Sequence, residues 1–212
     1  MILTVANQKG GAGKSTLVIA LANYLSKIGK ELIVVDFDFQ QTVYTLWKMD
    51  CDTYKTQLYN VVKIKLKEAK EVEKILNIAV KNKDKIFVFD LPGKIDEKNI
   101  FPILKNSDKV IVPFSYDKST FESTYTFTQV LNHKSIGVKA EDILFVPNRI
   151  KTSAKFADKE KIYKALNEYG TITNEIPDRV AFQRIETHKL SADVNNACEE
   201  VFIDILNLAY GK

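Results

Sequence analysis

The stretch Asn7-Gln8-Lys9-Gly10-Gly11-Ala12-Gly13-Lys14-Ser15-Thr16 decides the fold of this chain. It follows a short apolar run at residues 2–6 and precedes an apolar helical pattern that begins near Lys14. Glycines let backbone N–H groups curl around an anion without Cβ clashes, and a helix N-terminus adds the positive end of a dipole. The order strand, glycine-rich turn and helix therefore predicts a phosphate-binding loop.

This loop contains the groups that a nucleoside triphosphate needs. The predicted nucleotide contacts are Gly10, Gly11, Ala12, Gly13, Lys14, Ser15 and Thr16. We expect the backbone N–H groups of the glycine stretch to bind phosphate oxygens and Lys14 to reach the β- and γ-phosphates. The Ser15 hydroxyl is expected to ligate Mg²⁺. Gln8 stands where the strict phosphate-loop pattern has a glycine, and Lys9 adds a second lysine before the glycines.

Acidic residues follow two of the predicted buried strands. Asp36 and Asp38 come at the end of the run at residues 31–36, and Asp90 ends the run at residues 85–90. The carboxyl ends of parallel strands form the crevice where α/β proteins bind ligands, so these carboxylates are expected beside the phosphate loop. Phosphoryl transfer to water needs one group that positions the water and others that help to hold Mg²⁺. Solvated acids at strand ends are the alternative interpretation.

Two of these motifs resemble those of the ParA/MinD ATPases, whose phosphate loop has the deviant Walker A form Lys-Gly-Gly-x-Gly-Lys-Ser-Thr. The resemblance is strongest to the small, Soj-like ParA partition ATPases, and over residues 2–40. It implies three catalytic residues, Lys9, Lys14 and Asp38. It implies three magnesium ligands, Ser15, Asp36 and Asp90. Phe39 departs from the family, in which proline usually follows the second aspartate.

The same resemblance implies a base site and a dimer. An Asn-Arg pair ends the predicted strand at residues 142–149, so Asn148 and Arg149 are expected to contact adenine, with Pro177 near the base. In this family two subunits sandwich two ATP molecules, and the lysine at the position of Lys9 reaches the partner's nucleotide. The resemblance therefore implies a homodimer that forms with ATP and separates after hydrolysis.

Apolar runs alternate with helical patterns along the whole chain. Strands are expected at residues 2–6, 31–36, 59–64, 85–90, 109–114, 142–149 and 171–172, the third of them at an edge. Helices are expected from near Lys14 to residues 27–29, and at residues 42–48, 67–83, 119–131, 155–168 and 199–208. This alternation predicts an α/β fold in which one domain, residues 1–212, has a doubly wound, mostly parallel sheet with helices on both faces.

Composition is consistent with a cytoplasmic protein. The 212 residues include 31 basic and 27 acidic side chains, a net charge of +4, which permits contact with DNA without arguing for it. Cys51 and Cys198 are far apart and have no metal-like spacing, as expected for reduced thiols. No apolar run approaches the roughly 20 residues that span a bilayer.

The family divides according to what the ATP-bound dimer binds. The pattern at residues 199–208 is apolar and acidic, which predicts a packing helix rather than the basic amphipathic membrane helix of MinD. Arg179, Arg184 and Lys189 lie in the segment where ParA-type members bind DNA non-specifically; ordinary surface cations are the alternative. The resemblance implies a slow ATPase that partitions plasmids or chromosomes, or positions other cargo, with a ParB-like stimulator and without a membrane partner.

Two other functions stay open. A small-molecule ligase similar to dethiobiotin synthetase would share the fold and the nucleotide site, but its turnover would depend on a substrate and not on DNA. An accessory ATPase that positions a conjugation or secretion system would differ only in its cargo.

Overall fold

The computed structural model describes residues 1–94, 98–151 and 158–211. Its centre is a seven-stranded sheet in the order β3-β2-β4-β1-β5-β6-β7, and every neighbouring pair is parallel. The strands are β1 (Ile2–Val5), β2 (Leu32–Asp36), β3 (Asn60–Lys63), β4 (Ile86–Asp90), β5 (Lys109–Phe114), β6 (Ile143–Pro147) and β7 (Thr171–Ile172). The prediction of a parallel sheet with an edge strand near residue 60 is confirmed.

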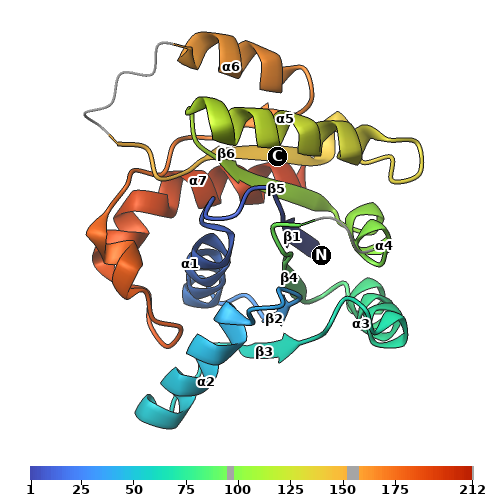
Figure 1. The fold of residues 1–212 in the computed structure, drawn as a ribbon. Coiled ribbons are helices and arrows are strands. Elements are labelled where there is room, and N and C mark those ends of the chain that lie inside the picture. The colour runs from blue at the N-terminus through green and yellow to red at the C-terminus, as the bar shows by residue number, and fades with distance from the viewer. Residues whose placement is uncertain (95–97, 152–157, 212) are drawn as a thin grey trace.

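Helices cover both faces of this sheet (Figure 1). One face carries α1 (Lys14–Lys27), α2 (Thr42–Tyr54) and α7 (Ala192–Tyr210). The other face carries α3 (Ala69–Lys81), α4 (Ile100–Lys105), α5 (Lys118–Asn132) and α6 (Lys159–Asn167). Two short 3₁₀ helices, η1 (Ala140–Asp142) and η2 (Val180–Arg184), lie in the connections.

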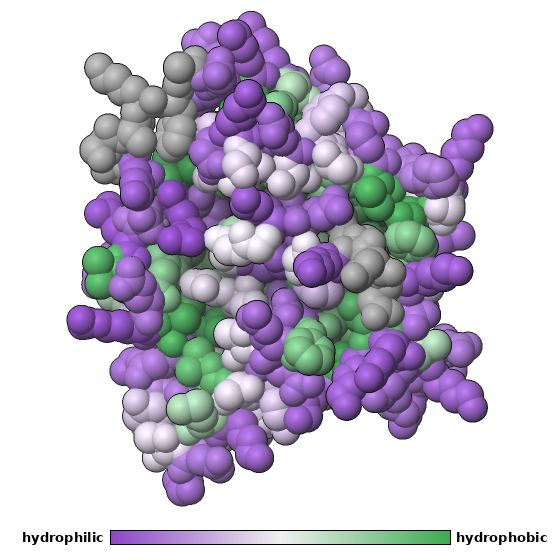
Figure 2. All heavy atoms as spheres, viewed as in Figure 1, coloured by the Kyte–Doolittle hydropathy of each residue, from purple (hydrophilic) through white to green (hydrophobic). Residues whose placement is uncertain are grey.

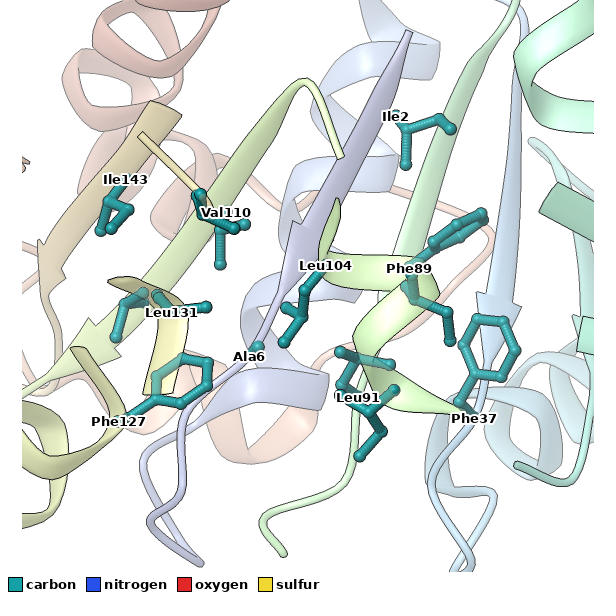
Figure 3. Packing of buried hydrophobic residues seen from close by; sticks show 14 of the residues in the cluster. Ile2, Ala6, Phe37, Phe89, Leu91, Leu104, Val110, Phe127, Leu131 and Ile143 are labelled. Carbon is teal, nitrogen blue, oxygen red and sulfur yellow. The ribbon is translucent and has the colours of Figure 1, made fainter. Parts of the chain in front are cut away.

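The sheet separates two apolar cores. On β1, Ile2 packs into the core beneath α3 to α6, whereas Leu3 and Val5 pack against α1 and α7. Figure 3 shows the first core, where Phe37 and Phe89 meet almost at right angles with ring centroids 5.4 Å apart. Strands covered on both faces bury successive side chains, which explains the continuous apolar runs in the sequence.

The face of the molecule seen in Figure 2 is largely polar. Hydrophilic side chains cover most of the face seen in Figure 2, and apolar side chains emerge in small areas between them. Among the described residues, no helix combines the length and apolarity that a membrane crossing requires.

Two helices are longer than the sequence pattern predicted. Helix α2 continues beyond residue 48 to Tyr54, and its polar residue Asp50 is buried by contacts with a distant segment of the chain. Helix α7 begins at Ala192, where the Ser191 side chain accepts a hydrogen bond from the Val194 N–H. The first three residues of the helix predicted at 155–168 lie outside the described residues, and α6 covers most of the remainder.

Candidate nucleotide-binding site

The phosphate loop connects β1, in the middle of the sheet, to α1. Gly11 and Gly13 adopt left-handed backbone conformations with φ of +78° and +85°, which explains why glycine is needed there. The loop after β4 approaches it closely. A Cβ atom added to Gly93 would lie 3.2 Å from Lys14 Nζ and 3.4 Å from the Gly10 nitrogen. The ends of β1 and β4 therefore form one compact site.

Lys14 is buried at the centre of this site. Its Nζ donates a hydrogen bond to the Lys9 carbonyl oxygen at 3.1 Å, so the side chain curls back along the loop. Burial lowers the pKa of Lys14, while the charges of Asp90 and Asp38 oppose this effect. The ammonium group thus lies between the glycine loop and the acidic strand ends, as a phosphate-binding lysine must.

Asp90 is fully buried at the end of β4. Neither carboxylate oxygen finds a hydrogen-bond partner in the part of the chain that the structure describes. Burial raises the pKa of Asp90 to about 8. The nearby Ser15 hydroxyl opposes this rise, although it forms no hydrogen bond of ordinary geometry with the carboxylate. Since an orphaned buried carboxylate is costly, these oxygens have the character of cation ligands.

Asp36 lies beside Asp90 because the two residues are register partners on β2 and β4. Its oxygens are already engaged: Oδ1 accepts the Asp38 N–H and Oδ2 accepts the Tyr44 N–H, each at 3.0 Å. Burial raises the pKa of Asp36, and these two hydrogen bonds oppose the rise. Asp36 therefore shapes the turn after β2 and holds the first turn of α2.

Asp38 lies in this turn and is partly exposed. Because β2 ends at Asp36, Asp38 lies beyond the strand, and the two acids do not belong to one extended segment. Asp38 Oδ1 accepts the Gln40 N–H at 2.9 Å. Phe39 between them is 93% exposed and therefore contributes nothing to the core.

The acidic groups fit a magnesium ion only together with a nucleotide. Within residues 1–94, 98–151 and 158–211, no group of three or more His, Cys, Asp or Glu side chains is arranged to hold a metal. Mg²⁺ is commonly held by one or two carboxylates with phosphate oxygens and water. The orphaned oxygens of Asp90, with the Ser15 hydroxyl nearby, meet that requirement. The assignment of Asp36 as a ligand stays a prediction.

A groove of about 380 Å³ opens beside the phosphate loop. One wall is the loop, and the others are the ends of β5 and β6 and the start of α5. Sequence reasoning missed the α5 contribution. Asp117 caps this helix by accepting the Thr120 N–H at 2.9 Å, and an aspartate before a helical pattern is the signal that would have indicated it.

Lys9 lies at the rim of the groove and makes a contact that the sequence did not predict. Its Nζ donates to Ser119 Oγ at 2.8 Å, in an exposed position at the start of α5. Burial tends to raise the pKa of Asp117, but hydrogen bonds from Ser115 and Thr120 and the charge of Lys9 hold it below its usual value. The lysine is therefore at the surface, beside an ionised carboxylate.

Asn148 and Arg149 contact the phosphate loop itself. Asn148 Nδ2 donates to the Ala12 carbonyl at 2.9 Å, and Arg149 Nη1 donates to the Gly11 carbonyl at 3.1 Å. Pro177 lines a neighbouring groove of about 560 Å³, which also contains Glu200 and other carboxylates. Because the glycine loop lines only the smaller groove, we assign the nucleotide to that one.

The three predicted DNA-binding residues lie together in sequence but differ in their surroundings. Arg179 and Arg184 are exposed, and neither forms an ion pair within 4 Å with an acidic side chain among the described residues. Arg179 also lines the larger groove. Lys189 Nζ lies 2.8 Å from Glu186 Oε2, which offsets part of its charge.

The segment at residues 186–189 is held by α1 and α2. The Asp50 carboxylate accepts hydrogen bonds from the Thr187 N–H at 2.6 Å and from its hydroxyl at 2.8 Å. Asn23 Nδ2 donates to the carbonyl oxygens of residues 186 and 189. Sequence reasoning missed this network, because nothing in the local pattern pairs α2 with a segment more than 130 residues later.

A glycine loop between a central parallel strand and a helix, with acidic ends on the neighbouring strands, defines a P-loop nucleotide-binding domain. The family model of the CobQ/CobB/MinD/ParA nucleotide-binding domain matches residues 3–192, and the chain belongs to this family of nucleotide-binding ATPases.

Comparisons with individual proteins agree with this assignment. The chromosome-partitioning ATPase Soj of Thermus thermophilus is 53% identical over 38 residues, which span 18% of this chain and 15% of that protein. A protein described as a plasmid partition protein of Borrelia burgdorferi B31, bound to AMPPNP, has a TM-score of 0.74 at 19% identity, over 97% of this chain and 98% of that one. The Aquifex aeolicus MinC:MinD cell division complex gives 0.75 at 17% identity, over 97% and 96%. The two structural matches, at 19% and 17% identity, establish the fold alone.

Proposed function

We propose that this protein is an ATP-dependent switch: it dimerises with ATP and Mg²⁺, binds DNA non-specifically as a dimer, and is released by slow hydrolysis. The role would be partition of a plasmid or chromosome, or positioning of another cargo, with stimulation by a ParB-like protein. Family membership supports nucleotide binding, and the short similarity to Soj supports the partition branch. The chain would then lie on the nucleoid when ATP is bound, and in the cytoplasm otherwise.

The position of Lys9 is the observation that best supports an ATP-dependent dimer. Its side chain is at the rim of the groove and, within the part of the chain that the structure describes, donates its hydrogen bond to the Ser119 hydroxyl, which a competing phosphate can replace. Lys14 already occupies the inside of the loop, so a second lysine is not needed there for the chain's own nucleotide. A charge so placed is suited to a nucleotide bound by a second copy of the chain.

Hydrolysis is assigned to groups that surround the γ-phosphate position. The N–H groups of the glycine loop and the Lys14 ammonium would hold the phosphates and neutralise charge as the bond to the leaving oxygen breaks. Asp38, partly exposed beside Lys14, would orient the attacking water, so that ATP and water give ADP and phosphate. Bound Mg²⁺, held by Asp90 and Ser15, would supply further charge stabilisation on the phosphates.

DNA binding is tested by gel shift on random-sequence duplex DNA with the Asp38→Ala protein, in no nucleotide, ADP or ATP. A shift with ATP alone that weakens steeply with salt is the expected result, because phosphate contacts release counterions. Lys14→Ala is the control that should lose nucleotide binding and the shift together. A dimer with ATP but no shift in any state would keep the ATPase and reject DNA as its partner.

The same preparations distinguish the other candidates. Asp38→Ala that stays monomeric with ATP, as measured by light scattering, would refute the dimeric mechanism. ATP hydrolysis that needs a small-molecule substrate and ignores DNA would favour a ligase similar to dethiobiotin synthetase. ATP-dependent dimers that ignore DNA but bind a component of a conjugation or secretion system would favour an accessory positioning ATPase.

A further inference from the structure

The phosphate loop is held by the two residues that follow β6. Asn148 Nδ2 donates to the carbonyl oxygen of Ala12, and Arg149 Nη1 donates to that of Gly11. The family resemblance implies contacts from both residues to adenine. In the structure both side chains also hydrogen-bond to the loop that would bind the phosphates.

The geometry of the peptide unit gives these two bonds a consequence. In a trans peptide the C=O of one residue and the N–H of the next point in opposite directions. Holding the Gly11 carbonyl toward Arg149 therefore turns the Ala12 N–H away from Arg149, and holding the Ala12 carbonyl toward Asn148 turns the Gly13 N–H away from Asn148. These N–H groups are the ones expected to bind phosphate oxygens. Since Gly11 and Gly13 permit many other conformations, the loop needs such restraints.

The surrounding structure is built to keep these contacts. Asn148 is buried, and its Oδ1 accepts the Arg149 N–H at 3.0 Å. Arg149 has a left-handed backbone with φ of +58°, a conformation that residues with a side chain adopt rarely and at a cost. Its Nε lies 4.0 Å from Asp178 Oδ1, which lines the same groove. A Cβ atom on Gly13 would come within 2.5 Å of Asn148 Nδ2, so loop and side chain are in close contact.

We infer that Asn148 and Arg149 are positioning residues of the triphosphate subsite: they orient the Ala12 and Gly13 N–H groups before nucleotide binds. The inference rests on the proposed nucleotide site and assigns part of its affinity to residues that need no contact with the base. It requires that removal of either side chain weakens the binding of ATP and of a polyphosphate without a base by the same factor.

The test compares binding of ATP and of inorganic tripolyphosphate, both with Mg²⁺, by calorimetry. Asn148→Ala and Arg149→Ala should each weaken both ligands by a similar factor, roughly five- to tenfold for one lost hydrogen bond. Asn82→Ala is the matched control, because it removes the same kind of bond, an asparagine amide to a carbonyl at 2.7 Å, at the end of α3. Arg149→Lys keeps the charge but lacks the planar guanidinium group, so it should recover only part of the lost binding affinity.

A second measurement needs no ligand. Hydrogen exchange of the Ala12 and Gly13 amides, followed by NMR in the nucleotide-free protein, should be several-fold faster in Arg149→Ala and Asn148→Ala and unchanged in Asn82→Ala. Weaker ATP binding with unchanged tripolyphosphate binding and unchanged exchange would overturn the inference and restore a base contact. Wild-type protein that binds no ATP would instead reject the proposed function, whatever the exchange rates show.

Discussion

Gly13→Ala offers a sharp test of the phosphate-loop geometry, because Gly29 provides a matched control. Both glycines have left-handed backbones, with φ of +85° and +75°. A Cβ atom at Gly29 would meet nothing within 4 Å, whereas at Gly13 it would lie 2.5 Å from Asn148 Nδ2. The two substitutions therefore share the cost of backbone strain and differ in the contact with Asn148.

The magnitudes follow from these two contributions. Alanine in a left-handed conformation costs about 1–2 kcal/mol, and the lower entropy of the unfolded chain returns about 0.5 kcal/mol. We therefore expect Gly29→Ala to lower the free energy of unfolding by about 1 kcal/mol. Gly13→Ala must also displace the Asn148 amide from the Ala12 carbonyl, which adds about 1 kcal/mol for the lost hydrogen bond.

Urea denaturation of the nucleotide-free proteins measures both values, and a double-mutant cycle isolates the contact. In an Asn148→Ala background the amide is absent, so Gly13→Ala should cost no more than Gly29→Ala does. The expected coupling energy is about 1 kcal/mol. Equal costs of Gly13→Ala in the two backgrounds would show that the loop and Asn148 do not touch as described.

Three further results are expected. Asp90→Asn should stabilise the nucleotide-free protein by about 3 kcal/mol at pH 8, because it removes an unpaired buried carboxylate. The raised pKa means that ionising Asp90 costs stability as the pH rises from about 4 toward 8. The extra stability of Asp90→Asn, measured by thermal denaturation, should therefore vanish at low pH. A difference between the two proteins that does not depend on pH would contradict this explanation. Lys9→Ala should bind ATP in calorimetry with near wild-type affinity yet remain monomeric in light scattering; an ATP-dependent dimer of this variant would exclude the role of Lys9. In salt-dependent DNA binding, Arg184→Ala should weaken the ATP-bound form more than Lys189→Ala, since Lys189 is paired with Glu186 and Arg184 has no ion pair among the described residues. The reverse order would contradict the assignment.

Local sequence patterns predicted the sheet because parallel strands buried on both faces need continuous apolar runs. The phosphate loop and Asp90 were found for the same reason: each follows a strand that the pattern makes unmistakable, and β1 and β4 turn out to be neighbours. The edge position of β3 also followed from its short, half-polar run. Each of these features is determined by the sequence of a single segment.

Features that depend on two distant segments were not predicted. Nothing near Asp50 in the sequence indicates that Thr187 will bury it, so α2 was expected to end at residue 48. The role of Asp36 in holding the start of α2 required knowing where β2 stops. Likewise, Asn148 was assigned to the base from the family pattern, whereas its contact with Ala12 depends on the spacing between β6 and the loop. Such contacts depend on tertiary packing and leave no local periodicity.

The network around residues 186–189 also constrains how ATP could control DNA binding. The segment is hydrogen-bonded by Asp50 on α2 and by Asn23 on α1, so the fold itself holds the backbone around Lys189 in place. A segment that the fold already orders gains nothing from refolding. ATP dependence is then better explained by bringing two copies of this segment together in a dimer, which raises affinity through effective concentration. The slope of log affinity against log salt should therefore roughly double between a monomeric variant and the ATP-bound dimer. A slope that is unchanged, with affinity that still rises, would instead require the segment to rearrange when ATP binds.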